Sequence, residues 1–221
     1  LCSFCPAGKA FSNSRSLCTS CILGLYQERN DRPSAACKAC GDGFAAPNAT
    51  DICRECTAGK TQIPATEYGC KACGSGQFAA NNATACGDCP RGKVQGAATA
   101  REYETACTHC LSGLFQEHPG KSVCMNCKPG KYTSIKGSIS CAECAPGQWA
   151  DSAASVMCEK CSPGWSSHED RTRCFQCPAG YHSKISGSAE CEACDTNQRQ
   201  FTDALGQVSC SVCPVGQESS G

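Results

Sequence analysis

Every cysteine in this sequence belongs to a C-x-x-C pair, and the pairs recur at nearly regular intervals. The 26 cysteines form thirteen pairs, which begin about every 17 residues along the whole sequence. A period of this length is typical of a tandem array in which each repeat is one small structural unit. We place the repeats at residues 2–17, 18–36, 37–52, 53–69, 70–85, 86–106, 107–123, 124–140, 141–157, 158–173, 174–190 and 191–209, with the start of a further repeat at 210–221.

Large apolar side chains are too few for a conventional hydrophobic core. Leu, Ile, Val and Phe together make 26 of 221 residues, well below the roughly 20 % at which chains normally fold without cross-links. Cross-links are therefore expected to replace the core.

The charges balance, with 20 basic and 20 acidic residues. A net charge near zero gives no long-range field to attract nucleic acid or an anionic membrane, so neither is expected as a partner. It also removes the repulsion between copies and so permits self-association. The sequence contains no apolar run long enough to cross a bilayer and no signal-peptide pattern at its start, so we expect a mature protein or a fragment without direct membrane insertion.

A glycine follows the second cysteine by three residues in twelve of the thirteen pairs, and Asn197 stands at the remaining position. Glycine reaches positive φ without a steric penalty and Asn is the next most tolerant residue, so this position predicts a left-handed turn. Short segments then flank Lys136-Gly137 or Ser186-Gly187 and indicate a small hairpin closed at its base by cysteine. We expect the fold class to be small disulfide-rich repeats of short β-hairpins and turns, with little or no helix, in an elongated rod-like tandem array. An aromatic residue usually follows the glycine, and we expect these rings to pack over the bridges.

Zinc is the main alternative to disulfides, because two C-x2-C pairs at this separation resemble a zinc ribbon. Four-cysteine sites would leave one of thirteen pairs over, and Gly directly follows the second cysteine only at Gly41 and Gly74, unlike most zinc knuckles. Free thiols also require a reducing compartment, and nothing else in the sequence is typical of one. We therefore expect bridges, with no metal and no cofactor. Haem attachment, thioredoxin-type and iron–sulfur sites need C-x-x-C contexts that are missing here.

Three local connectivities remain open for the bridges. Each pair could close on itself, or neighbouring pairs could cross first-to-first and second-to-second. The third joins the second cysteine of one pair to the first of the next, and we favour it because it treats every repeat alike. It leaves Cys2 and Cys213 open at the two ends of the sequence. Its bridges are Cys5 with Cys18, Cys21 with Cys37, Cys40 with Cys53, Cys56 with Cys70, Cys73 with Cys86, Cys89 with Cys107, Cys110 with Cys124, Cys127 with Cys141, Cys144 with Cys158, Cys161 with Cys174, Cys177 with Cys191, and Cys194 with Cys210.

The pattern C-x-x-C-x-x-G-x-[Tyr/Phe], as in CKPGKYTSIKGSISCAEC and CPAGYHSKISGSAECEAC, resembles the ephrin-receptor-like cysteine-rich repeat of large extracellular proteins. It is also similar to the first module of tumour-necrosis-factor-receptor repeats and to C-x-x-C arrays of protist surface proteins. By analogy with the receptor module, the resemblance favours the third connectivity. It implies an extracellular stalk, coat or ectodomain spacer.

Few residues outside the cysteine pattern indicate chemistry. His109, His118, His168 and His182 occupy different positions in their repeats, and no nucleophilic or paired-carboxylate grouping recurs, so we expect no enzyme and no catalytic residue. The charged runs at 168–170 and 101–104 are interpreted as solvated side chains. The sequons at Asn48 and Asn82 predict exposed N-linked glycans.

Three functions are compatible with these features. The first is an extracellular structural protein, which either self-associates into a filament or coat or forms the stiff stalk of a larger surface protein. The ends of the sequence interrupt the repeat pattern, which suits continuation from copy to copy. The second is a ligand-binding receptor ectodomain, for which Arg101 to Thr105 would supply the distinctive patch. The third is an intracellular multi-zinc adaptor.

Overall fold

The fold is a series of short β-hairpins that follow one another along the sequence. The computed structural model describes residues 4–12, 17–33, 35–63, 68–95 and 107–218. They contain twelve two-stranded sheets, each built from consecutive strands, and no α-helix. The prediction of small disulfide-bonded hairpins with little helix is confirmed. The pairs are β1 (Lys9–Ser12) with β2 (Leu17–Ser20), β3 (Leu25–Tyr26) with β4 (Lys38–Ala39), β5 (Phe44–Ala45) with β6 (Arg54–Glu55), β7 (Lys60–Gln62) with β8 (Cys70–Ala72), β9 (Gln77–Phe78) with β10 (Gly87–Asp88), β11 (Lys93–Val94) with β12 (Thr108–His109), β13 (Leu114–Phe115) with β14 (Met125–Asn126), β15 (Lys131–Tyr132) with β16 (Ala142–Glu143), β17 (Gln148–Trp149) with β18 (Glu159–Lys160), β19 (Trp165–Ser167) with β20 (Cys174–Gln176), β21 (Tyr181–His182) with β22 (Glu192–Ala193), and β23 (Gln200–Phe201) with β24 (Ser211–Val212).

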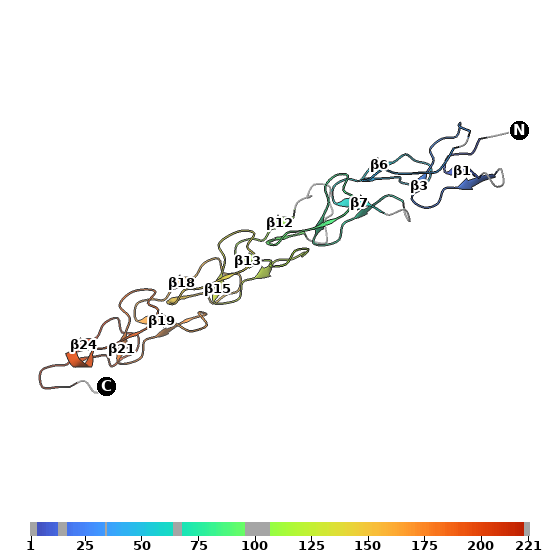
Figure 1. Cartoon of the computed structure of the whole chain (residues 1–221). Helices are drawn as coiled ribbons and strands as arrows, with labels where there is room; N and C mark the ends of the chain where they lie inside the picture. The colour runs from blue at the N-terminus through green and yellow to red at the C-terminus, as the bar shows by residue number, and fades with distance from the viewer. Residues whose placement is uncertain (1–3, 13–16, 34, 64–67, 96–106, 219–221) are drawn as a thin grey trace. The chain divides into compact units, whose positions relative to one another are not determined.

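The hairpins group into two units. The first contains Leu1–Thr108 and Pro119–Val123, and the second contains His109–His118 and Cys124–Gly221. Within each unit the hairpins follow one another in sequence order (Figure 1).

A disulfide closes the base of every hairpin. Each of the twelve bridges joins the second cysteine of one pair to the first cysteine of the next, so the structure has the third of the three connectivities. The second strand of most hairpins lies between the two cysteines of the following pair, as β16 does between Cys141 and Cys144, whereas β2, β8 and β20 also include the first cysteine. Cys213 is the one cysteine without a bridge in the described part of the chain, and it is buried. Cys2 lies outside the described residues.

The interior consists of sulfur, small side chains and a few polar groups. Cys56, Cys89, Cys127 and Cys177 are completely buried, and the buried apolar residues of the described segments are all Cys or Ala. The aromatic rings do not form this interior. Tyr132 and Trp149 are only half-buried, and Tyr181 is 43 % exposed. The bridges themselves therefore form the interior, and the packing of rings over them stays a prediction.

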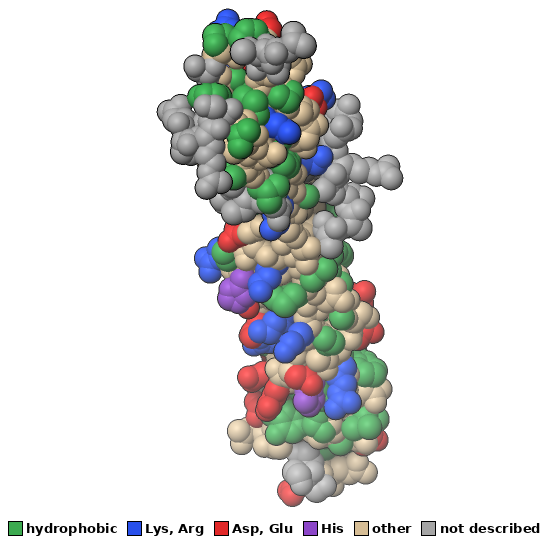
Figure 2. Space-filling view, turned by 90° about the vertical axis from the view of Figure 1, so that its right-hand side faces the viewer, with side chains coloured by type: hydrophobic (Ala, Val, Ile, Leu, Met, Phe, Trp, Pro, Cys, Tyr) green, Lys and Arg blue, Asp and Glu red, His purple; other side chains and the backbone are tan. Residues whose placement is uncertain are grey.

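Many large apolar side chains stay at the surface. Ile135, Ile185 and Leu205 lie close to hairpin tips and are 69 %, 66 % and 61 % exposed. On the face shown in Figure 2, hydrophobic side chains form small groups between basic and acidic ones. The exposed apolar surface is thus divided among the repeats.

Backbone hydrogen bonds join each hairpin to the next one. The glycine N–H after the bridge donates to a carbonyl of the following hairpin, from Gly113 to Thr133 and from Gly130 to Ala150, both at 2.8 Å. In the opposite direction, the Gly137 N–H at a hairpin tip donates to the Cys110 carbonyl at 2.7 Å. Main-chain groups, which every sequence can supply, therefore form most of these links. At Gly43 and Gly147 the acceptor is instead a side-chain oxygen, of Gln62 and Ser167.

The same glycines also contact the hairpin two places further along. Gly113 has φ +82°, and a Cβ there would overlap the carbonyl oxygen of Ala154 at the tip of the β17–β18 hairpin. A Cβ at Gly164 would likewise overlap the Gly206 carbonyl. Glycine is needed for two independent reasons, the positive φ and the close approach of a second backbone.

Asn197 does not occupy the left-handed position expected for it. That position belongs to Arg199, with φ +58°, and the Cys213 N–H donates to the Arg199 carbonyl at 2.9 Å, as Cys144 does to Gly130. Asn197 instead lies in the 3-10 turn Thr196–Gln198, where its N–H donates to the side chain of the capping residue Asp195. This repeat has two additional residues between Cys194 and the turn. The left-handed position therefore cannot be found by counting three residues from the cysteine.

Gly113→Ala should destabilise the second unit more than Gly180→Ala, its matched control. Gly180 has φ +83°, but a Cβ added there would meet no atom within 4 Å among the described residues, so this variant should lose only about 1–2 kcal/mol from left-handed strain. Gly113→Ala should lose a further ~1–3 kcal/mol because it overlaps a second backbone. Hydrogen exchange at the Ala154 amide, which donates to the Cys127 carbonyl, measures the difference. Equal protection in both variants would show that the second-neighbour contact contributes nothing.

Candidate functional site

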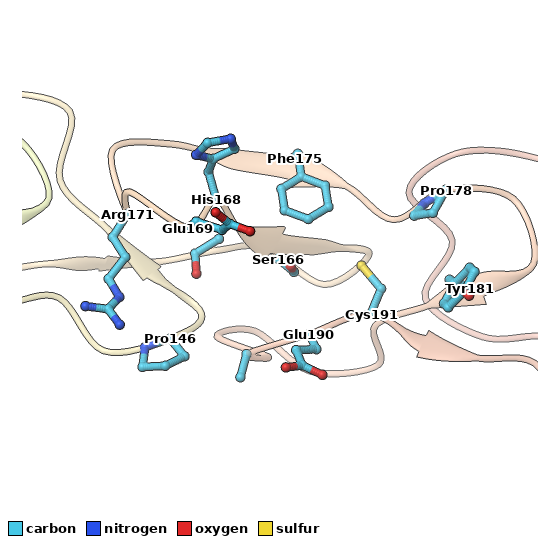
Figure 3. A pocket seen from close by; sticks show the side chains of 12 residues that line it. Pro146, Ser166, His168, Glu169, Arg171, Phe175, Pro178, Tyr181, Glu190 and Cys191 are labelled. Atoms are coloured by element: carbon cyan, nitrogen blue, oxygen red, sulfur yellow. The ribbon is translucent and has the colours of Figure 1, made fainter.

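A surface hollow of about 550 Å³ lies in the second unit, where the β19–β20 hairpin meets β21 (Figure 3). Its size falls within the range of about 300–1,000 Å³ that is usual for binding pockets. It is open to solvent on one side. Because the remaining repeats bury mainly sulfur and backbone, this hollow is the strongest candidate for recognition by side chains.

The apolar part of the hollow is formed by two exposed rings and two prolines. Phe175 in β20 and Tyr181 in β21 are 42 % and 43 % exposed; Pro178 lies near Tyr181, and Pro146 lines the end of the hollow near Arg171. Phe175 is the only aromatic residue that directly follows the first cysteine of a pair. Ser166 pairs with Phe175 across the hairpin and is almost completely buried, so it lies at the floor.

The charged part of the hollow comes from the loop after β19 and from Glu190. His168 and Arg171 are already bound by carboxylates, because His168 Nδ1 lies 2.9 Å from Asp170 Oδ1 and Arg171 Nη1 donates to Glu143 Oε2 at 2.7 Å. Glu169 and Glu190 are exposed and make no ion pair or side-chain hydrogen bond to any described residue. The two free carboxylates therefore decide which charge the hollow accepts.

The loop is ordered by its own polar groups. Asp170 Oδ1 accepts hydrogen bonds from the backbone N–H of Thr172 at 3.0 Å and from its hydroxyl at 2.8 Å. These two bonds, with a smaller contribution from His168, lower the pKa of Asp170 to about 2. A side-chain hydrogen bond from Lys131, and to a smaller extent one from Arg171, lowers the pKa of Glu143. The run at 168–170, interpreted from sequence as solvated charge, is indeed exposed or half-buried, but it forms a defined turn beside the hollow.

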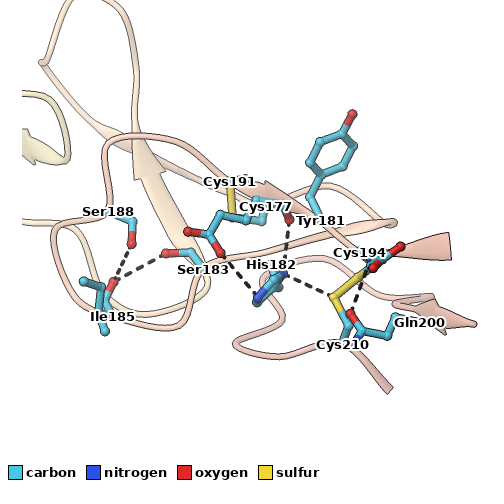
Figure 4. A network of polar contacts seen from close by, with 12 residues as sticks. Cys177, Tyr181, His182, Ser183, Ile185, Ser188, Cys191, Cys194, Gln200 and Cys210 are labelled. Atoms are coloured by element: carbon cyan, nitrogen blue, oxygen red, sulfur yellow. Dashed lines mark hydrogen bonds and ion pairs between the residues drawn. A yellow bond between two sulfur atoms is a disulfide. The ribbon is translucent and has the colours of Figure 1, made fainter. Parts of the chain in front are cut away.

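A second cluster surrounds the last bridge (Figure 4). His182 Nδ1 lies 3.2 Å from Cys210 Sγ and 3.1 Å from the Glu192 carbonyl oxygen. His182, Cys194 and Cys210 have the spacing of a metal site, the one such trio among the described residues. Cys194 and Cys210 are bonded to each other, so neither offers the thiolate that a metal requires. The cluster is a disulfide with an adjacent imidazole.

The other residues singled out from the sequence are not brought together. The four histidines lie in different hairpins, and His118 contacts only Glu117 among the acidic groups of the described segments, at 3.2 Å. Asn48 and Asn82 are both exposed. The run at 101–104 and the segment from Arg101 to Thr105 lie outside the described residues.

Sequence reasoning did not find the hollow, although two signals pointed to it. The search for rings considered only those after the glycine and so passed over Phe175. The run His168–Arg171 is unusual in placing four ionisable residues together in a hairpin loop.

No family model matches the chain, and no curated protein matches it. The helical residues among those described include no segment long and apolar enough to cross a membrane. Twelve disulfides indicate an oxidising environment, extracellular or secretory.

The Asp170 carboxyl group should titrate near pH 2 rather than at its ordinary pKa of 3.8. Because its pKa is depressed in the folded state, its contribution to stability is present above the ordinary value and is lost as the pH falls through about 2. Thr172→Val removes the hydroxyl donor but keeps the backbone donor. The pKa of Asp170 should therefore rise part of the way from about 2 toward 3.8. Carboxyl carbon shifts in NMR titrations measure both values. An ordinary pKa that the substitution leaves unchanged would contradict the described turn.

Proposed function

We propose that this chain is a non-enzymatic extracellular structural protein. It acts as a disulfide-stapled array that builds a cell-surface filament or coat, or as the stiff stalk of a larger surface protein. The observation that carries the proposal is the linkage of neighbouring hairpins through main-chain hydrogen bonds, together with close contacts that several of them make with the hairpin two places along. An array held in this way resists bending because moving one repeat disturbs two neighbours.

The bridges allow the chain to carry a pulling force without unfolding the loops that they close. Each closes a loop with a sequence separation of 13 to 18 residues and a Cα–Cα distance of 5.4 to 5.8 Å. A pulling force passes through the sulfur atoms and bypasses each loop. In each repeat, only the two residues between the cysteines of a pair belong to no bridged loop, so only this short segment of backbone carries the force.

A ligand-binding ectodomain is the second candidate function, and the hollow at Phe175 and Tyr181 is the observation that favours it. The segment from Arg101 to Thr105, to which the sequence assigned this role, lies outside the described residues. The hollow is a local feature of one part of an array of similar hairpins, which suits one contact added to a structural role.

Reduction should lengthen the stretched chain about fourfold. A reduced repeat of about 17 residues extends to about 60 Å at roughly 3.5 Å per residue. With the bridges closed, three Cα–Cα steps and one bridge of 5.4 to 5.8 Å give about 16 Å per repeat. Single-molecule stretching from the two ends, with and without a reducing agent, measures the ratio. A chain that extends equally in both conditions would refute the stapled array.

Asn48 and Asn82 should each carry one N-linked glycan when the chain is secreted from a eukaryotic cell. Both side chains are exposed, although Asn48 Oδ1 accepts hydrogen bonds from the Thr50 N–H and hydroxyl, both at 2.8 Å, in the folded protein. Intact-mass measurement before and after glycosidase treatment counts the glycans, and Asn48→Gln and Asn82→Gln should each remove one. A secreted protein with the mass of the unmodified chain would contradict the prediction that these two residues are glycosylated.

A further inference from the structure

We propose that the hollow at Phe175 and Tyr181 binds a basic hairpin tip of a second copy of this chain. The inference rests on the proposed function, since it names the contact through which copies associate into a filament or coat. The proposal has two requirements. The hollow must favour a positively charged group carried on an aliphatic side chain, and a hairpin tip must present such a side chain.

The hollow is suited to a cation because of what remains unpaired within it. Glu169 and Glu190 have no ion-pair partner among the described residues, whereas the Arg171 guanidinium is bound to Glu143. The exposed faces of Phe175 and Tyr181 add attraction for a cation above a ring. The same rings and the two prolines that line the hollow can cover an aliphatic stem.

Two hairpin tips of the second unit carry this chemistry. Lys136 follows Ile135 at the tip of β15–β16, and Lys184 precedes Ile185 at the tip of β21–β22. Both isoleucines are more than 60 % exposed. Both lysines are exposed and form no ion pair or side-chain hydrogen bond with the described residues. Each tip therefore presents a free cation beside an uncovered apolar side chain.

The two tips are built alike and held in place. The Ser138 hydroxyl donates to the Ile135 carbonyl at 2.8 Å, and the Ser188 hydroxyl donates to the Ile185 carbonyl at 3.0 Å. Gly137 is anchored by its N–H to Cys110, and Ser186 by its hydroxyl to the Cys161 carbonyl at 3.0 Å. A tip that is already ordered loses little conformational entropy on docking.

The tip of β23–β24 provides a contrast within the same chain. Leu205 is 61 % exposed there, but the charged residue beside it is Asp203. The Glu169 and Glu190 carboxylates would repel this tip, so apolar exposure alone does not select it.

A second copy fits as the occupant because both halves of the contact lie on one chain whose net charge is zero. Copies therefore approach without net repulsion. A tip and a hollow are different surfaces, so the contact is heterologous and leaves a free tip and a free hollow on every pair. Repetition of such a contact gives an open assembly when it does not close into a ring, as a filament or coat requires.

The test uses reciprocal charge reversal in the whole oxidised chain. A hollow variant carries Glu169→Lys and Glu190→Lys, and a tip variant carries Lys136→Glu and Lys184→Glu. Each variant alone sets like charges against each other, so self-association measured by analytical ultracentrifugation should weaken about tenfold or more. A mixture of the two variants restores opposite charges at the contact between unlike copies and should regain association.

The control makes the same change in net charge as the tip variant without touching the contact. Lys71→Glu with Lys128→Glu alters two other exposed lysines, and this variant should associate as the parent does. The recovery in the mixture also shows that both test variants are folded.

Each other outcome overturns the inference in a distinguishable way. Parent-like association of the hollow and tip variants would show that copies meet at another surface, which leaves the structural function standing. A mixture that does not recover would refute the pairing of these two surfaces. A parent that remains monomeric at every concentration would overturn the second copy as occupant together with the assembly part of the proposed function, whether or not basic segments of other proteins bind the hollow.

Discussion

The bridge from the second cysteine of one pair to the first of the next is the interaction on which the rest of the structure depends. It closes each hairpin at its base, and its buried sulfur atoms take the place of a hydrophobic core. Strands of two to four residues are too short to pair stably by themselves. Without the bridges neither the hairpins nor the contacts between them would have a fixed base.

Stacking is the second requirement, and it uses mainly the backbone. In most of the described repeats the turn glycine donates to the next hairpin, to a side-chain oxygen at Gly43 and Gly147, and in several repeats it lies close to a carbonyl of the hairpin beyond. At the last described hairpin Arg199 holds the left-handed conformation with a full side chain, and its guanidinium donates to the carbonyls of Pro214 and Gln217. Side chains can therefore differ from repeat to repeat at the hairpin tips and at the two positions between the cysteines of a pair.

Local features of the fold were predictable from sequence, because the cysteine period, the glycine position and the short hairpins are all local patterns. The second-neighbour contact was not, since a carbonyl above Gly113 comes from a residue 41 positions away and has no sequence signal of its own. The Asn197 position failed because a two-residue insertion moves the turn to Arg199. The hollow was missed for a similar reason, since it depends on how two successive hairpins place Phe175 and Tyr181 around one hollow.

The proposed function follows from this division of roles. A backbone-linked array gives stiffness, and variable positions such as Phe175, Glu169 and Lys136 can add contacts without disturbing it. The central claim is tested most directly by a disulfide map of the secreted protein, obtained by mass spectrometry of peptides cleaved without reduction. The account predicts twelve bridges between the second cysteine of each pair and the first of the next, from Cys5 with Cys18 to Cys194 with Cys210. Bridges within pairs, crossed bridges between neighbouring pairs, or free thiols that hold zinc would contradict it.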